Sequence, residues 1–254
     1  MSQAKASIPP TPAAAAFIAS VERLHPRIAA FDCDGTLWNE DSGEHFMHWE
    51  IERGVLPDGA VRRLQARYRD YRNGQVSEEA ICGEMVTIHE GLSTAVLERE
   101  AQEFFASKIA GTIFPEMQEL VSRLREQKCE IWAVSSTNDW VIRAAARHFG
   151  IPEDHVLAAR VYCEAGLATG RLDFVPSGKD KAVDLSKVLS GPLDVAFGNS
   201  IHDAAMLAMA SHSFAVNPNP DLREMAQQRG WTVYFPAGSG SQKTARSQKA
   251  EGRK

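Results

Sequence analysis

The sequence predicts an α/β fold in which a helical segment is inserted after the first strand of a parallel sheet. Short apolar runs at 27–31, 130–134 and 193–197 are typical of buried strands in such a sheet. Apolar residues at helical spacing separate these runs, and no strand pattern occurs between residues 39 and 111. Alternation of strands and helices favours right-handed crossovers and an open sheet.

A polar cluster follows each predicted strand, at 32–36, 135–139 and 198–200. Ligands of open α/β sheets bind beyond the carboxyl ends of the strands. We therefore expect the three clusters to meet in one site. The helices between the strands begin at Pro115 and near Trp140, and the second ends before Gly150.

The chain divides into segments of different composition. We expect a flexible leader over 1–20, an α/β core formed by 21–38 and 112–236, and a helical cap over 39–111. Residues 237–254 carry a net charge of +4 and no apolar residue larger than alanine, which predicts a disordered basic tail. Without the tail, the rest of the chain has a net charge of -9 rather than the -5 of the whole.

The composition excludes several classes of protein. Of 254 residues, 44% are hydrophobic and 24% are charged, as in ordinary globular proteins. No run approaches the ~20 apolar residues that a membrane span requires, so we expect no membrane partner. The net charge of -5 argues against a nucleic-acid partner. Four widely spaced cysteines predict reduced thiols and a cytoplasmic location.

Two carboxylates stand at the end of the first predicted strand. Asp32 and Asp34 are two residues apart, so in extended backbone both side chains project to the same side. Carboxylates this close repel each other, which favours a role as metal ligands or as an acid/base pair. A calcium loop also begins D-x-D-G, but Leu37 and Gly43 occupy positions that such a loop gives to Gly and Glu.

The run from Asp32 to Leu37 matches the D-x-D-G-T motif and resembles that of the haloacid-dehalogenase-like hydrolases, in their phosphoserine-phosphatase-like branch. The resemblance extends over about residues 25–236 and implies a Rossmann-like core with a helical cap. It implies that Asp32 is the nucleophile that forms an aspartyl-phosphate, and that Asp34 is the general acid and base. It also implies Mg²⁺, bound by Asp32 and the backbone carbonyl of Asp34, with the Thr36 hydroxyl near the substrate.

The second and third motifs of the resemblance would bind the phosphate. Ser135 ends the second predicted strand and would donate to a phosphate oxygen, with Ser136 as the alternative. The run 178–183 resembles the lysine motif and selects Lys181, with Lys179 as second choice. Such a lysine would compensate the charge of the nucleophile and of the phosphoryl group.

The fourth motif, residues 198–207, departs from the family pattern. Asn199 replaces an acidic metal ligand, whereas Asp203 is retained and could bind the metal directly or through water. An amide oxygen can still coordinate Mg²⁺, with one negative charge fewer. A serine-nucleophile elbow would need Gly at the position of His202, so that alternative is not favoured.

The resemblance also implies residues that contact the rest of the substrate. An early glutamate of the cap would meet a polar group of the substrate, and Glu44 is the candidate, with Asp41 close behind. A substrate carboxylate could be bound by cap arginines, although we expect most of them to lie on solvated helix faces. These arginines are Arg53, Arg62, Arg67 and Arg69.

Weaker signals have simpler interpretations. His45 and His48 could bind a metal, but surface or packing roles are favoured because no Cys or third His lies nearby. Residues 164–170 resemble the hairpin that precedes the lysine motif in this branch, and 215–220 resemble its closing segment.

We therefore expect a cytoplasmic Mg²⁺-dependent phosphomonoesterase that acts on a small, phosphoserine-like metabolite. A phosphotransferase to another alcohol is one alternative. A non-catalytic phosphoryl-binding module, suggested by Asn199, is the other.

Overall fold

A seven-stranded sheet forms the centre of the protein. The computed structural model describes residues 11–239. The strand order is β4-β3-β2-β1-β5-β6-β7, and all neighbours are parallel except β3 and β4. The strands are β1 (Ile28–Phe31), β2 (Glu130–Asn138), β3 (Val156–Glu164), β4 (Leu167–Phe174), β5 (Val195–Gly198), β6 (His212–Val216) and β7 (Thr232–Tyr234). This confirms the predicted α/β class.

The predicted hairpin is the antiparallel pair β3–β4. Its turn consists of Ala165 and Gly166, with φ angles of 49° and 77°. Two consecutive residues with positive φ form the type of two-residue turn that follows the twist of the strands.

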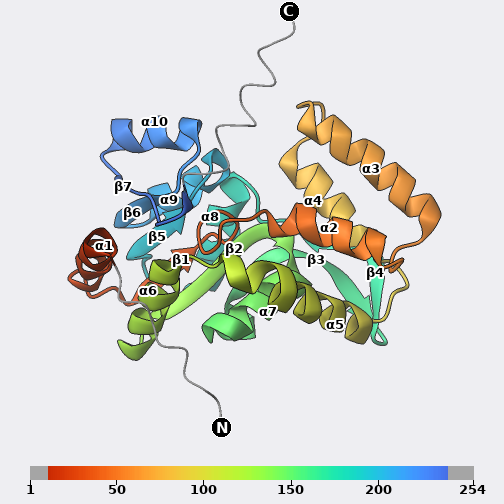
Figure 1. The fold of residues 1–254 in the computed structure, drawn as a ribbon, viewed down its shortest axis with the longest axis horizontal. Helices are drawn as coiled ribbons and strands as arrows, with labels where there is room; N and C mark the ends of the chain where they lie inside the picture. Colours follow the sequence, from red (N-terminus) through yellow and green to blue (C-terminus); the bar gives the residue numbers. More distant parts are fainter. Residues whose placement is uncertain (1–10, 240–254) are drawn as a thin grey trace, which may run out of the picture.

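Helices cover both faces of the sheet (Figure 1). Helices α1 (Pro12–Glu22), α6 (Pro115–Glu126) and α7 (Asp139–Phe149) pack against one face, in the larger hydrophobic cluster. Helices α8 (Lys179–Val188), α9 (Ala204–Met209) and α10 (Pro220–Arg229) pack against the other. In β1, Ala29 and Phe31 face the first cluster and Ile28 and Ala30 face the second, so every residue of this strand is buried.

The prediction of a flexible leader over 1–20 is wrong for residues 12–20. They belong to α1, whose first turn is capped by the Thr11 hydroxyl, which accepts a hydrogen bond from the N–H of Ala14. Phe17, Ile18 and Val21 are buried in the larger cluster, and the alanine-rich sequence has high helix propensity. Residues 1–10 lie outside the described residues. Of the predicted tail, only 237–239 are described.

Four helices follow β1, as the apolar spacing predicted. They are α2 (Ser42–Glu52), α3 (Asp58–Arg72), α4 (Glu78–Thr87) and α5 (Thr94–Phe104). Helix α5 packs against α7, and its Leu97, Ala101 and Phe104 belong to the larger cluster. A small separate cluster of Met47, Leu64 and Ile81 joins α2, α3 and α4, which we call the cap helices. Figure 1 shows α3 and α4 above the β3–β4 end of the sheet.

Candidate active site

The three predicted polar clusters meet at the carboxyl edge of β1, β2 and β5. A cavity of about 680 Å³ lies there, between the sheet and the cap helices. Asp32 follows β1, and its N–H donates to the Phe197 carbonyl of β5 at 2.9 Å. The cavity is lined by Asp32, Asp34 and Ser135 from the sheet side and by Glu44 and Tyr68 from the cap helices.

Lys181 connects the first and fourth motifs. Its Nζ donates to Asp32 Oδ1 at 2.8 Å and to Asp203 Oδ1 at 2.6 Å, and the side chain is only 2% exposed. Lys179 is exposed, so the structure brings Lys181, rather than Lys179, to the nucleophile candidate. The lysine lies in the first turn of α8, after Gly178, whose φ is 56°.

The charges of this cluster depend on one another. Burial disfavours the charge of Lys181, but the carboxylates of Asp203 and Asp32 outweigh burial and raise the pKa of the ammonium group. Burial and the charge of Asp203 raise the pKa of Asp32 to about 7, although the ammonium of Lys181 opposes this shift. One ammonium group therefore lies between two buried carboxylates, and the cluster retains an excess of negative charge.

The hydroxyl of Thr36 orients the nucleophile candidate instead of lining the cavity. It donates to Asp32 Oδ2 at 2.8 Å, and Thr36 is fully buried. The structure thus places Thr36 away from the substrate-contacting position that the resemblance implied. Both oxygens of Asp32 accept hydrogen bonds, which fixes the orientation of its carboxylate.

Asp34 is held by three donors from separate parts of the chain. The Trp38 indole donates at 2.8 Å, the Ser42 N–H at 2.6 Å and the Thr137 hydroxyl at 2.7 Å. Because Ser42 is the first residue of α2, these bonds connect the second carboxylate directly to a cap helix. The sequence analysis did not select Thr137, although it stands within the second motif cluster.

Ser135 and Ser136 both line the cavity, and they have different partners. Ser135 Oγ accepts from the Thr137 N–H at 3.1 Å, which leaves the hydroxyl proton free for a ligand. Ser136 Oγ donates to Glu78 of α4 at 2.6 Å. Asn138, only 5% exposed, also lines the cavity, and its Nδ2 has no hydrogen-bond partner among the described residues.

The fourth motif forms a tight turn around Asp203. Asp203 Oδ2 accepts the backbone N–H groups of Asn199 and Ser200, each at 2.9 Å. With Oδ1 on Lys181, both carboxylate oxygens have partners. Asn199 lies against Gly35, where a β-carbon would come within 1.9 Å of the Asn199 amide nitrogen.

The oxygen atoms here suit a magnesium ion. In the part of the chain that the structure describes, no three His, Cys, Asp or Glu side chains are grouped in a way that could hold a metal. The Asp32 carboxylate, the Asp34 carbonyl and the Asn199 amide are nevertheless hard oxygen donors. Mg²⁺ commonly uses one or two carboxylates and retains several waters, so this donor set fits it.

The two predicted cap carboxylates, Asp41 and Glu44, both line the cavity. Asp41 caps α2, accepting the Glu44 N–H at 2.9 Å, and burial together with the charge of Asp34 raises the pKa of Asp41 to about 6. The Glu44 carboxylate lies 3.9 Å from Arg72. Sequence reasoning missed Glu78, which accepts from Ser136 and pairs with His202 at 2.7 Å. No local pattern marks Glu78, because its partners come from β2 and from the fourth motif.

The predicted arginines do not reach the cavity. Arg53 pairs with Glu100 at 2.6 Å and Glu103 at 3.0 Å, and Arg67 pairs with Glu84 at 2.7 Å. Arg62 and Arg69 are also absent from the cavity lining within residues 11–239. His45 approaches Glu40 at 3.7 Å and His48 is exposed, so the structure does not bring the two histidines together with a third ligand.

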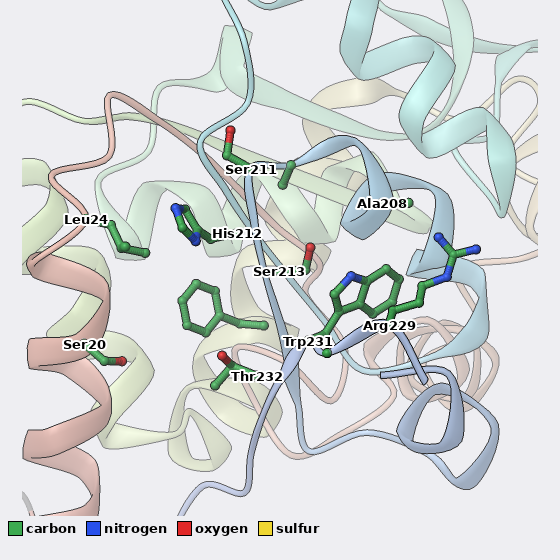
Figure 2. Close-up of a pocket in the computed structure, with 12 residues that line it drawn as sticks. Ser20, Leu24, Ala208, Ser211, His212, Ser213, Arg229, Trp231 and Thr232 are labelled. Carbon is green, nitrogen blue, oxygen red and sulfur yellow. The ribbon is translucent and has the colours of Figure 1, made fainter. Parts of the chain in front are cut away.

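A second cavity, of about 540 Å³, lies at the opposite edge of the sheet. Figure 2 shows His212 and Thr232, the first residues of β6 and β7, beside Ser20 of α1. The guanidinium carbon of Arg229 lies 5.5 Å from the centroid of the Trp231 ring there. Among the described residues that line this cavity there is no Asp or Glu, whereas the nucleophile candidate Asp32 lines the first cavity.

Known proteins share this architecture. The chain is similar to the histidinol-phosphatase of Neisseria meningitidis, with 29% identity over 218 residues that cover 81% of this chain and 97% of the relative. It is 26% identical to the phosphoserine phosphatase SerB1 of Mycobacterium tuberculosis over 219 residues, covering 81% of this chain and 69% of the relative.

Solved structures agree with the fold. A protein of unknown function from Bordetella pertussis matches with a TM-score of 0.72 and 26% identity, covering 82% of this chain and 98% of that one. A substrate-bound phosphoserine phosphatase matches with a TM-score of 0.56 and 18% identity, over 83% of this chain and 92% of that one. The family model of the haloacid dehalogenase-like hydrolases matches residues 29–208. The chain therefore belongs to the haloacid dehalogenase-like hydrolase family, as an enzyme of its phosphatase type.

Proposed function

We propose that this protein is a Mg²⁺-dependent phosphomonoesterase that hydrolyses a small phosphorylated metabolite through an aspartyl-phosphate on Asp32. The observation that carries this proposal is the orientation of Asp32 at the floor of the cavity by Lys181 and Thr36. A carboxylate held from both oxygens is positioned for attack and loses little freedom on reaction. Relatives named for phosphoserine and for histidinol support an ester of this size.

The reaction would proceed in two steps. An oxygen of Asp32 forms a bond to phosphorus while the bond between phosphorus and the alcohol oxygen breaks, and Asp34 gives its proton to that oxygen. Water then attacks phosphorus, Asp34 takes a proton from it, and the bond between phosphorus and Asp32 breaks to release inorganic phosphate. Lys181 would compensate the charge of the equatorial phosphate oxygens, and Ser135 would donate to one of them.

Mg²⁺, when bound, would shield the phosphate from the carboxylates. Asp32, the Asp34 carbonyl and the Asn199 amide oxygen would hold it. Asp203 would act through water, because it is fully buried and does not line the cavity, whereas Asp32 does. The four free cysteines support a cytoplasmic, reducing location.

The test is hydrolysis of p-nitrophenyl phosphate in the presence of Mg²⁺. We expect activity in the wild type and a loss of at least about 10³-fold in Asp32→Asn, which keeps the shape of the side chain and removes the nucleophile. Activity that survives this substitution would exclude Asp32 as the nucleophile. Binding of phosphate analogues without any turnover would instead indicate a phosphoryl-binding module. Product formation only after addition of an acceptor alcohol would indicate a phosphotransferase.

A further inference from the structure

A bulge near the end of β2 turns two hydroxyl side chains out of the regular ladder. Where β2 pairs with β3, the three steps from Ser135 to Asn138 face a single step of β3. The two residues between them are therefore extra residues of the strand, and bulges of this kind re-aim side chains beside active sites. The second of the two, Thr137, directs its hydroxyl to Asp34.

The three donors to Asp34 are of two kinds. Oδ1 accepts from the Trp38 indole N–H at 2.8 Å and from the Ser42 backbone N–H at 2.6 Å. Both groups can only donate, so a proton on Oδ1 would face two other hydrogens. Oδ2 accepts from the Thr137 hydroxyl at 2.7 Å, its one hydrogen-bond partner within residues 11–239. Because a hydroxyl can either donate or accept, Oδ2 is the oxygen that can both carry and release a proton.

The surroundings fix the position of the Thr137 hydroxyl. Thr137 is only 8% exposed, and its N–H donates to Ser135 Oγ at 3.1 Å. Helix α2 approaches from the other side, so closely that a β-carbon at Gly43 would lie 3.0 Å from Thr137 Oγ1. The glycine therefore lets the helix confine the hydroxyl without displacing it.

We propose that Thr137 is a positioning residue, whose hydroxyl holds Asp34 Oδ2 toward the phosphate ester so that this oxygen gives the proton to the departing alcohol. The inference rests on the proposed phosphomonoesterase function, which assigns the proton transfer to Asp34 but to neither of its oxygens. As the bond between phosphorus and the alcohol oxygen breaks, the proton moves from Oδ2 to that oxygen. The Thr137 hydroxyl donates to the carboxylate that forms, so this hydrogen bond strengthens as the transition state is reached.

The test varies how strongly the departing alcohol needs a proton. p-Nitrophenyl, phenyl and benzyl phosphate are similar in size, but p-nitrophenolate leaves readily as an anion, phenolate less readily, and the alkoxide of benzyl alcohol requires a proton. The value of kcat/KM reports the steps up to departure of the alcohol and excludes hydrolysis of the aspartyl-phosphate. In Thr137→Val with Mg²⁺ present, the ratio of kcat/KM for p-nitrophenyl phosphate to that for benzyl phosphate should rise about ten- to a hundredfold, the value of one hydrogen bond to a charged group. Phenyl phosphate should show an intermediate loss.

Three further variants separate positioning from packing. Thr137→Ser keeps the hydroxyl and should return the ratio to within about threefold of wild type. Thr87→Val is the matched control, because the half-buried Thr87 donates its hydroxyl to the Gly83 carbonyl of its own helix at 2.9 Å, and it should leave the ratio unchanged. Gly43→Ala tests the same contact should Thr137→Val fail to fold, since its methyl group would displace the hydroxyl and raise the ratio.

A ratio in folded Thr137→Val within about threefold of wild type would overturn the proposal. Thr137→Ser that behaves like Thr137→Val would also overturn it, because the methyl group would then carry the effect.

A double substitution shows whether Thr137 acts through Asp34. Asp34→Asn keeps an acceptor for Trp38 and Ser42 and removes the proton donor. In this background, Thr137→Val should lower kcat/KM for phenyl phosphate by less than it does when Asp34 is present. Equal losses in the two backgrounds would indicate a structural role and contradict the proposal.

The same esters separate this proposal from the proposed function. A wild type that hydrolyses none of the three would contradict the phosphomonoesterase and with it the role of Thr137. A wild type that hydrolyses all three, with a ratio that Thr137→Val leaves unchanged, would contradict only the role of Thr137.

Discussion

Replacement of Lys181 by Met should reduce both activity and stability, and the stability deficit should depend on pH. The substitution keeps an unbranched, buried side chain and removes the ammonium group between Asp32 and Asp203. Breaking a buried ion pair by removal of one partner costs about 3–5 kcal/mol, a large part of the 5–15 kcal/mol that stabilises a typical protein. Loss of a preorganised group that compensates transition-state charge reduces kcat by about 10²–10³-fold.

The direction of the pH dependence follows from Asp32. Lys181 lowers the pKa of this carboxyl, and without it the pKa in the folded protein rises further above the unfolded value of about 3.9. The folded variant then binds more protons than the unfolded chain between that value and its raised pKa, so its stability falls as pH rises. We expect the deficit relative to wild type to be small near pH 5 and largest near pH 8.

The assays are urea unfolding at pH 5, 6.5 and 8, and p-nitrophenyl phosphate hydrolysis with Mg²⁺. Lys179→Met is the matched control, because Lys179 lies two residues earlier in the same helix and is exposed. Its activity should stay within about twofold of wild type, and its stability within about 0.5 kcal/mol. Equal effects of the two substitutions, or a Lys181→Met deficit that does not change with pH, would refute the reasoning.

Three further predictions concern the rest of the site and the cap. Gly35→Ala should lower activity at least about tenfold, because φ is 76° at Gly35 and the new β-carbon would meet Asn199. Gly74→Ala is the control: φ is 74° there and the space around the new β-carbon is open, so this substitution should add only backbone strain of about 1–2 kcal/mol. Both ring nitrogens of buried His89 face acceptors, Val86 O at 3.0 Å and Glu50 Oε1 at 2.8 Å, so the ring is protonated. Burial opposes this charge, but Glu50 outweighs burial and raises the pKa of His89. The stabilisation by the charged ring is therefore complete below about pH 6.5 and is lost as pH rises through the raised pKa. The free energy of unfolding should differ more between pH 6 and pH 9 in the wild type than in His89→Gln. Chelation with EDTA should abolish p-nitrophenyl phosphate hydrolysis, and excess Mg²⁺ should restore it; activity that persists in EDTA would exclude the metal requirement.

Much of the fold could be predicted from local pattern. The run 27–31 indicated a buried strand because a strand with both faces covered is apolar at every position, and β1 is buried throughout. The prediction of a flexible leader was wrong because the Ala and Pro content of this segment was given more weight than its apolar residues Phe17, Ile18 and Val21. These three side chains bury one face of α1, a feature that becomes visible only when the helix lies against the sheet.

The choice between neighbouring candidates could not be made from spacing. Lys179 and Lys181 are two residues apart in a helix, so they point to nearly opposite sides, and which side meets Asp32 depends on how α8 docks. Likewise, the guanidinium group of every cap arginine is chemically suited to bind a substrate carboxylate. Their glutamate partners come from other helices, and only packing determined that Arg53 and Arg67 pair with these instead of lining the cavity.

By itself, the sequence determined where the chemistry lies along the chain. Asp32, Ser135 and Asn199 each follow an apolar run, and parallel strands must bring their carboxyl ends to one edge. Tertiary structure alone decided which charges are paired, and therefore what the cavity can accept. Glu78 is paired across the cap–core boundary with Ser136 and His202, because pairing depends on distances between segments that the linear order of residues does not contain.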